Sequence, residues 1–308
     1  MIAALSNRAA TRVKLLEAFA ASLPLGPVTE PHLRGALQQT LRHPGSLIRA
    51  QLVYELAGAY GLKDDRAEKL AVAVEYFHTA SLLFDDLPCM DDATQRRGEP
   101  CVHRSHGEAA AMLAALGLVN RAYALLWSGL AGSTPEQQSA AGDYVEKCLG
   151  VGGVLNGQSQ DLHYASRTGN RPSPQQIATG KTVSLIQLSL VLPALLGGAE
   201  PAEVRLLERL AAFWGLSYQA LDDLKDVFQQ SEQTGKTAAR DASLNRPNLA
   251  LAIGATNALR RLERLLRLGD CTLERLLQRL PSLAFLTELR GRFREELAGL
   301  QISKNAFA

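Results

Sequence analysis

The sequence is short of the features that identify several common protein classes. Four of its 308 residues are cysteine and no two form a Cys-x-x-Cys pair, so we expect free thiols rather than a disulfide framework or a cysteine-bound metal. Basic and acidic residues nearly balance, 33 against 31, which leaves a net charge of +2 and indicates no nucleic-acid partner. The six histidines are scattered and have no metal-ligand spacing.

Uninterrupted apolar runs are also missing. The most apolar stretch, residues 183–198, is broken by Gln187 and Pro193 and is too short to cross a bilayer. Residues 1–19 lack the basic start followed by an apolar block that marks a signal peptide. We therefore expect a cytoplasmic protein without stable insertion in a membrane.

Strand-forming patterns are absent as well, because Val, Ile and Thr never gather in alternating runs. Ala and Leu recur at helical spacing instead, for example over residues 66–84 and 107–127. No Pro/Gly/Ser-rich linker and no shift in composition divides the chain. The pattern predicts an all-α fold, a single large helical bundle formed by one domain over residues 1–308.

Against this background, the stretch LLFDDLPCMDDATQRRG is unusual, because four aspartates and two arginines follow an apolar run. Pro88 disfavours the helical conformation in the residue before it, so we expect a helix to end near Asp85 and Asp86. Asp91 then lies in a loop that can fold back toward Asp85. Carboxylates this close repel one another unless a strong positive charge binds between them.

A second acidic group, Asp222, Asp223 and Asp226, has the i, i+3 and i, i+4 spacing of one helical face. Magnesium prefers hard oxygen ligands, takes one or two carboxylates per ion and completes its shell with water and substrate phosphate oxygens. We interpret the two acidic groups as opposite walls of a cavity for a substrate that carries a diphosphate. The competing interpretation is that these acids are solvated on exposed helices.

With these motifs the sequence resembles the trans-isoprenyl diphosphate synthase family over about residues 42–250. The first aspartate-rich motif matches Asp85-Asp86-Leu-Pro-Cys-Met-Asp91, and the second matches the group that ends at Asp226. The family's remaining motif positions match His78, Arg96, Arg97, Gly157, Gln158, Asp161, Lys181, Thr182, Gln219 and Lys236.

The resemblance implies the fold of class I isoprenoid synthases, with a central cavity for diphosphate and Mg²⁺. It implies three Mg²⁺ ions, with Mn²⁺ able to substitute, between the aspartates and the diphosphate of an allylic prenyl substrate. The allylic C–O bond ionises, isopentenyl diphosphate attacks the carbocation, and a proton is lost. A homodimer is the assembly that the family leads us to expect.

The same resemblance implies a role for each matched position. The direct metal ligands are Asp85, Asp86, Asp91, Asp222 and Asp226, with Asp223 close behind them at the catalytic centre. The allylic diphosphate contacts Arg96, Lys181, Thr182 and Lys236, and isopentenyl diphosphate contacts Arg49, His78 and Arg97. Gln158 and Gln219 lie near the reacting carbons.

One departure keeps other functions open. Where the family has a lysine and an arginine ahead of Arg49, this chain has Ser46 and Leu47. A lost charge-assisted contact costs about 1.5–3 kcal/mol, unless Arg42 or His43 replaces it. The alternatives are a terpene synthase-like enzyme that ionises a prenyl diphosphate without elongation, and an inactive subunit that modulates an active synthase.

Product length should depend on the helix that ends at Asp85. Ser81 and Phe77 precede Asp85 by one and two helical turns on the same face, and Ala80 lies beside Ser81. In the family a large aromatic residue at the position of Ala80 commonly gives C15 products, whereas Ala80 and Ser81 are small. The first bulky side chain is Phe77, roughly 12 Å below the metals. We expect geranylgeranyl diphosphate (C20), with farnesyl diphosphate (C15) as the nearest alternative, unless Phe77 only fills the core.

Overall fold

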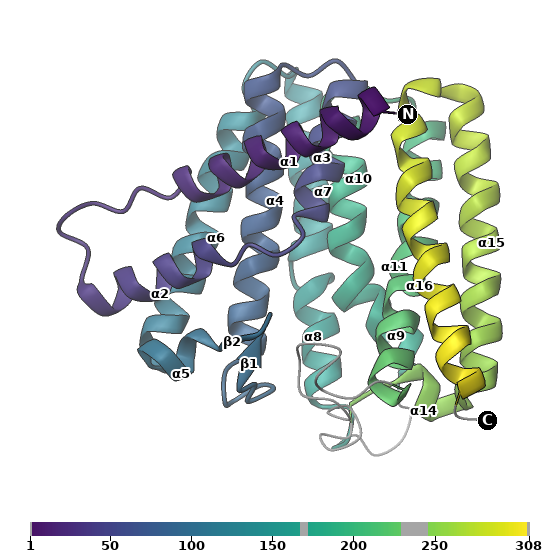
Figure 1. Ribbon diagram of the computed structural model, residues 1–308. Helices are drawn as coiled ribbons and strands as arrows, with labels where there is room; N and C mark the ends of the chain where they lie inside the picture. Colours follow the sequence, from purple (N-terminus) through teal and green to yellow (C-terminus); the bar gives the residue numbers. More distant parts are fainter. Residues whose placement is uncertain (1, 167–171, 229–245, 307–308) are drawn as a thin grey trace. The chain divides into compact units, whose positions relative to one another are not determined.

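The computed structural model describes residues 2–166, 172–228 and 246–306, and it confirms the expected all-α fold (Figure 1). Apart from one short hairpin, the regular elements of these residues are helices. Contacts divide the chain into two compact units, Met1–Thr134 and Pro135–Ala308, which are described separately. That the chain is one domain stays a prediction.

The first unit is built around a central helix, α4. Its elements are α1 (Ile2–Ala21), α2 (Pro31–Arg42), α3 (Ile48–Ala59), α4 (Asp64–Asp85), β1 (Gln95–Arg96), β2 (Glu99–Pro100), α5 (Val102–His106) and α6 (Glu108–Leu130). The helix α4 packs against both α3 and α6. Every residue from Leu70 to Phe77 is buried, so this part of α4 is surrounded by protein rather than exposing one face.

The helices α4 and α6 run antiparallel at close range. Near the start of α4, Arg66 Nε donates a 2.9 Å hydrogen bond to the carbonyl of Gly129, near the end of α6. Leu70 lies over Gly129, where a Cβ atom would come within 2.7 Å of the leucine side chain. These contacts fix the register between the two helices, and therefore which side chains of α6 meet each turn of α4.

The second unit is built around the long helix α11. Its elements are α7 (Pro135–Leu149), α8 (Val154–Leu162), α9 (Pro174–Ala178), a π-helix (Thr179–Val183), α10 (Ser184–Leu196), α11 (Pro201–Phe228), α14 (Leu249–Ile253), α15 (Ala255–Arg279), a 3₁₀-helix (Pro281–Phe285) and α16 (Leu286–Ala306). The helix α11 packs against α10 and α15, and α10 packs against α7.

Two helical segments are long and apolar enough to cross a membrane by length and composition alone, Glu108–Leu130 and Pro174–Leu196. The second is longer than the sequence led us to expect, because the helical segment begins at Pro174, ahead of residues 183–198, and is not interrupted at Gln187 or Pro193. In the protein, 44% and 67% of the two apolar windows are buried. Core packing therefore accounts for the apolar character of the second segment, and the cytoplasmic location stays a prediction.

The helix α8 and the π-helix meet backbone to backbone at Gly157. A Cβ atom at Gly157 would lie 2.2 Å from the backbone nitrogen of Lys181 and 2.5 Å from the carbonyl carbon of Gly180. Both neighbours are main-chain atoms, which cannot move aside as the end of a flexible side chain can. Packing therefore requires a glycine here, and the contact holds Lys181 next to α8.

We predict that Gly157→Ala lowers the free energy of unfolding by about 1–3 kcal/mol, because the added methyl group displaces the backbone of the π-helix. Urea denaturation followed by circular dichroism measures the change. The matched control is Gly142→Ala, at an exposed position inside α7 with open space around it, which should raise the free energy of unfolding by roughly 0.5–1 kcal/mol. A loss of equal size at both glycines would contradict the packing argument.

Candidate active site

The first aspartate group has the local structure expected from the sequence. The helix α4 ends at Asp85, with Asp86 as its C-cap residue. The loop then folds back, because the Asp91 N–H donates a 2.9 Å hydrogen bond to the Asp85 carbonyl and the Ala93 N–H donates a 3.1 Å bond to the Asp86 carbonyl. The backbone thus brings Asp91 close to Asp85, as predicted.

Asp86 forms an ion pair with Arg96. Asp86 is 3% exposed, and Arg96 reaches it with Nε at 3.0 and 3.2 Å from the two carboxylate oxygens and with Nη2 at 2.5 Å. Burial alone would lower the pKa of Arg96, but the hydrogen bond and charge of Asp86 raise it above its usual value. Arg96 therefore stays charged and neutralises Asp86, which leaves Asp85 and Asp91 as the more accessible carboxylates.

A tight turn presents Arg97. The strands β1 and β2 pair Arg96 with Glu99, so the turn consists of Arg97 and Gly98, which both have positive φ, 56° and 81°. This is the pattern of a two-residue hairpin turn, in which a non-glycine residue at positive φ is unusual. Arg97 Nη1 donates a 2.5 Å hydrogen bond to the His43 carbonyl. The main chain of His43, rather than its ring, thus positions a cation.

Gly45 leaves the space that the Arg97 guanidinium occupies. A Cβ atom at Gly45, which has φ 75°, would lie 2.5 Å from the Arg97 Cζ atom. The next two positions are those where the resemblance leads us to expect cations. Ser46 is exposed, whereas Leu47 is fully buried and adopts φ 53° before α3. A charged side chain at position 47 would have to be buried at a high cost, whereas the exposed position 46 can accept a cation without disturbing the core.

His78 lies among three arginines. Burial, followed by the positive charges of Arg49, Arg97 and Arg96, holds the pKa of His78 well below its usual value. The imidazole is therefore neutral at pH 7. The Nε atom of Arg49 is buried and has no hydrogen-bond partner in the part of the chain that the structure describes. Because Arg96 is paired with Asp86, Arg49 and Arg97 are the cations of this group that an anion could contact.

Glu75 is a buried acid that the sequence analysis missed. Its side chain is 2% exposed, and its carboxylate accepts a 3.1 Å hydrogen bond from the Ala50 N–H at the start of α3. Burial raises its pKa, while Arg49, the Ala50 N–H and Arg97 act in the opposite direction. An acidic residue inside the apolar run of α4 was the available signal. Glu75 links α3 to α4 next to Arg49.

A small pocket of about 50 Å³ that opens to solvent lies beside this group. Charged and apolar side chains share its wall, including Asp86, Arg96, Arg97, Leu82, Leu83 and Val102. Thr79 also lines it, and the buried hydroxyl of Thr79 has no hydrogen-bond partner among the described residues. The pocket is therefore suited to a ligand with both a charged and an apolar part.

The second aspartate group lies on α11, as predicted. Asp222 and Asp226 are partly exposed one turn apart, whereas Asp223 is 2% exposed. Asp223 accepts hydrogen bonds from Gln219 Nε2 at 2.8 Å and from the Leu249 N–H at 2.7 Å. Asn248 adds a 3.2 Å bond from its side-chain amide to the Asp223 carbonyl. Asp223 thus anchors the start of α14 and orients Gln219.

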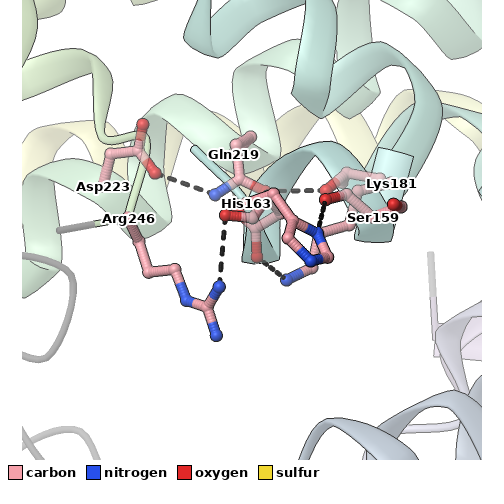
Figure 2. A network of polar contacts seen from close by, with 8 residues as sticks. Ser159, His163, Lys181, Gln219, Asp223 and Arg246 are labelled. Atoms are coloured by element: carbon pink, nitrogen blue, oxygen red, sulfur yellow. Dashed lines mark hydrogen bonds and ion pairs between the residues drawn. The ribbon is translucent and has the colours of Figure 1, made fainter. Parts of the chain in front are cut away.

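A chain of hydrogen bonds runs from the π-helix to α11 (Figure 2). The Thr182 hydroxyl donates to Gln219 Oε1 at 2.7 Å, and Gln219 Nε2 donates onward to Asp223. Both ends of the Gln219 amide are therefore fixed. Gln158 lies on α8, the helix that packs against this π-helix.

Asp161 holds two cations. Its carboxylate is 2.7 Å from Lys181 Nζ, and its main-chain carbonyl accepts a 3.1 Å hydrogen bond from Arg246 Nη1 (Figure 2). Lys181 was expected in the site, but Arg246 was missed because no spacing motif marks it and only the fold brings it to α8. Lys236, expected to bind the allylic diphosphate, lies outside the described residues.

The carboxylates fit magnesium as pairs. In the described part of the chain, no three His, Cys, Asp or Glu side chains form one metal-binding cluster. Magnesium does not require such a cluster, because it keeps several waters and uses one or two carboxylates together with substrate phosphate oxygens. Asp85 and Asp91, joined through the loop, and Asp222 and Asp226, one turn apart, are suitable pairs.

The residues expected to control product length lie on buried turns of α4. Phe77 and Ala80 are 8% and 1% exposed, and the Ser81 hydroxyl donates a 2.8 Å hydrogen bond to the His78 carbonyl. Phe77 contacts Tyr123 of α6 edge to face, with ring centroids 4.9 Å apart. Their role in product length stays a prediction.

Comparison with known sequences identifies similar proteins that are named as geranylgeranyl pyrophosphate synthases. The chain is 36% identical to the chloroplastic geranylgeranyl pyrophosphate synthase of Capsicum annuum over 236 residues, which are 75% of this chain and 63% of that protein. It is 32% identical to the chloroplastic geranylgeranyl pyrophosphate synthase 11 of Arabidopsis thaliana over 266 residues, 83% of this chain and 73% of that protein. The match thus spans less than two thirds of the Capsicum protein.

Solved structures share the fold. A geranyltransferase from Helicobacter pylori, solved with magnesium and isoprenyl diphosphate, gives a TM-score of 0.76 at 24% identity, over 96% of this chain and 97% of that one. The geranyltranstransferase of Thermotoga maritima gives 0.71 at 26% identity, over 92% and 97%. The expected isoprenyl synthase fold is therefore confirmed. Since a family model for polyprenyl synthetase also matches residues 30–275, the chain belongs to the polyprenyl synthetase family.

Proposed function

We propose that this protein is a Mg²⁺-dependent trans-prenyltransferase that joins isopentenyl diphosphate to an allylic prenyl diphosphate and releases geranylgeranyl diphosphate. The observation that carries the proposal is the pair of cations Arg49 and Arg97 beside His78: the His43 carbonyl holds Arg97 in the wall of the pocket, and the buried Arg49 Nε atom has no hydrogen-bond partner among the described residues. It lies in the same unit as Asp85 and Asp91 but consists of cations rather than metal-binding acids. Such a group is suited to a second diphosphate, which only an elongating enzyme needs.

The allylic diphosphate is bound through magnesium. Asp85 and Asp91 would form one pair of metal ligands, and Asp222 and Asp226 would form another. The family leads us to expect three ions, with Mn²⁺ as a substitute. When bound, Mg²⁺ neutralises the negative charge that develops on the leaving diphosphate. Asp86 contributes mainly by holding Arg96, and Asp223 by holding Gln219.

The chain's own cations complete this step. The Asp161 carboxylate holds Lys181 Nζ at 2.7 Å, and Lys181 can exchange this partner for a phosphate oxygen. Arg246 donates a hydrogen bond to the main-chain carbonyl of the same aspartate. Arg96, Thr182 and Lys236 are proposed to contact the same diphosphate. Gln158 and the fixed amide of Gln219 would lie against the allylic cation, whose charge their carbonyl dipoles stabilise. The proton is lost to the released diphosphate, so no protein base is required.

Isopentenyl diphosphate is bound by Arg49, His78 and Arg97. Arg97 is fixed by the His43 carbonyl and by the space at Gly45, so its guanidinium is preorganised. A terpene synthase-like enzyme, which ionises its substrate without elongation, has no use for these residues, and this alternative is not favoured. An inactive modulating subunit would have no reason to keep two groups of closely spaced acids.

The working form is proposed to be a homodimer, with isopentenyl diphosphate and allylic prenyl diphosphates as its substrates. Support comes from α6, where Met112, Leu113 and Leu116 are 40%, 53% and 55% exposed. Apolar side chains gathered on one helix are typical of a surface that another subunit covers. The proposed compartment is the cytoplasm, although the relatives compared above carry chloroplastic names.

We predict that Asp85→Ala and Asp222→Ala each remove most turnover, by about a hundredfold or more, because each deletes a metal ligand. The thermal midpoint without substrate should stay the same or rise slightly, since each change also relieves repulsion between carboxylates. Product formation at saturating Mg²⁺ measures the effect, and Asp143→Ala, an exposed acid on α7, is the control. Near-normal turnover in either variant would contradict the metal assignment.

The isopentenyl site leads to a second prediction. Arg97→Ala should raise the KM for isopentenyl diphosphate roughly ten- to hundredfold, and raise that for the allylic substrate less, because one charge-assisted contact is lost. Ser46→Lys should lower the KM, since position 46 is exposed beside Gly45. Arg12→Ala is the control, because Arg12 is an exposed arginine on α1 with no part in the proposed site. Turnover of an allylic diphosphate without any product longer than the primer would favour the cyclase alternative.

Product length gives a third prediction. Phe77→Ala should lengthen the product beyond C20, because the first bulky side chain of α4 below Asp85 is removed. Ala80→Phe should shorten the product to C15 or less, since an aromatic ring then stands one turn nearer the diphosphate. Chromatography of the dephosphorylated products measures both. Unchanged products in both variants would mean that α4 does not determine chain length.

A further inference from the structure

The Phe77 side chain does not stand alone at its level of α4. Its ring meets the ring of Tyr123 on α6 at a centroid distance of 4.9 Å and an interplanar angle of 75°. This edge-to-face arrangement is the favoured geometry of aromatic pairs. Phe77 is 8% exposed, whereas Tyr123 is 47% exposed, so the tyrosine is the outer member of the pair.

The antiparallel register places Tyr123 at the depth of Phe77. Gly129 lies beside Leu70, so each step along α4 toward Asp85 corresponds to a step back along α6. Phe77 precedes Asp85 by eight residues, about 12 Å along the helix axis. Between them on the same face of α4 are only the small side chains of Ala80 and Ser81. Phe77 is therefore the first bulky side chain below the aspartates on this face of α4, and Tyr123 is the residue of α6 that contacts it.

The other aromatic residues of α4 have different partners. Tyr76 points to α1, where its hydroxyl donates a 2.6 Å hydrogen bond to the Phe19 carbonyl and its ring contacts the Phe19 ring. Phe84 directly precedes Asp85 and is too close to the diphosphate end to limit a long chain. In the part of the chain that the structure describes, Phe77 is the one aromatic residue of α4 that contacts an aromatic side chain of α6.

We propose that Tyr123 is a specificity-determining residue that closes the hydrocarbon pocket together with Phe77. The proposal rests on the elongation function proposed above and assigns to α6 a role in it. Phe77 stops the growing chain directly, and Tyr123 prevents the Phe77 ring from turning aside. Removing Tyr123 opens a void into which the Phe77 ring can rotate, so the pocket lengthens although Phe77 is still present.

The test compares product lengths from the full-length enzyme with Mg²⁺, isopentenyl diphosphate and farnesyl diphosphate. The variants are Phe77→Ala, Tyr123→Ala, the double variant and Tyr123→Phe. Trp127→Ala is the matched control, because Trp127 is an exposed aromatic residue on α6, one turn further from the aspartate end. Circular dichroism and light scattering confirm that each variant keeps its helical content and its molar mass, and Tyr123→Val replaces Tyr123→Ala if that variant does not.

Tyr123→Ala should shift the main product by at least one C5 unit, and the double variant should give longer products than either single change. Tyr123→Phe and Trp127→Ala should give the wild-type distribution, because the first keeps the ring and the second lies outside the pair. Wild-type products from Tyr123→Ala, together with a double variant identical to Phe77→Ala, would overturn the assignment of Tyr123. A wild-type enzyme that yields no product longer than its primer would instead overturn the elongation function itself.

Discussion

The ion pair between Asp86 and Arg96 is the interaction that allows so many charges at the end of α4. Four aspartates follow one another within eight positions, and without a cation their repulsion would oppose the turn that brings Asp91 to Asp85. Arg96 neutralises the one carboxylate that is buried and leaves the more accessible ones to a ligand. Because Arg96 lies on β1, the same pair also fixes the hairpin that carries Arg97.

The second unit divides its acids in the same way. Asp223 is buried and hydrogen-bonded to Gln219 and to the start of α14, whereas Asp222 and Asp226 are partly exposed on the same helix. Asp161 likewise is 7% exposed and holds Lys181. In each unit, then, buried carboxylates position functional groups, and exposed ones are the candidates for metal binding. This division follows from the high cost of burying an unpaired charge.

Much of this arrangement follows from local sequence. The end of α4 near Asp85, the return of Asp91 and the common face of Asp222 and Asp226 depend on a proline and on helical periodicity, and all three predictions are confirmed. Partners from distant segments could not be derived in this way. Arg246 reaches Asp161 across 85 positions, and Glu75 reaches the Ala50 N–H across 25. The burial of Leu47 likewise depends on tertiary packing rather than on any pattern in its neighbourhood.

The π-helix at Thr179–Val183 has a consequence for how this segment can vary. A π-turn contains one residue more than the α-helical turn it replaces, and such turns are frequent at functional sites. The neighbours Lys181 and Thr182 use it to reach different helices, Lys181 bonding to α8 and Thr182 to α11. Deleting one residue would restore the α-helical phase and rotate everything on one side of the deletion by about 100°. The length of this segment is therefore constrained, and a homologue with a one-residue gap here would have to bind its substrate differently.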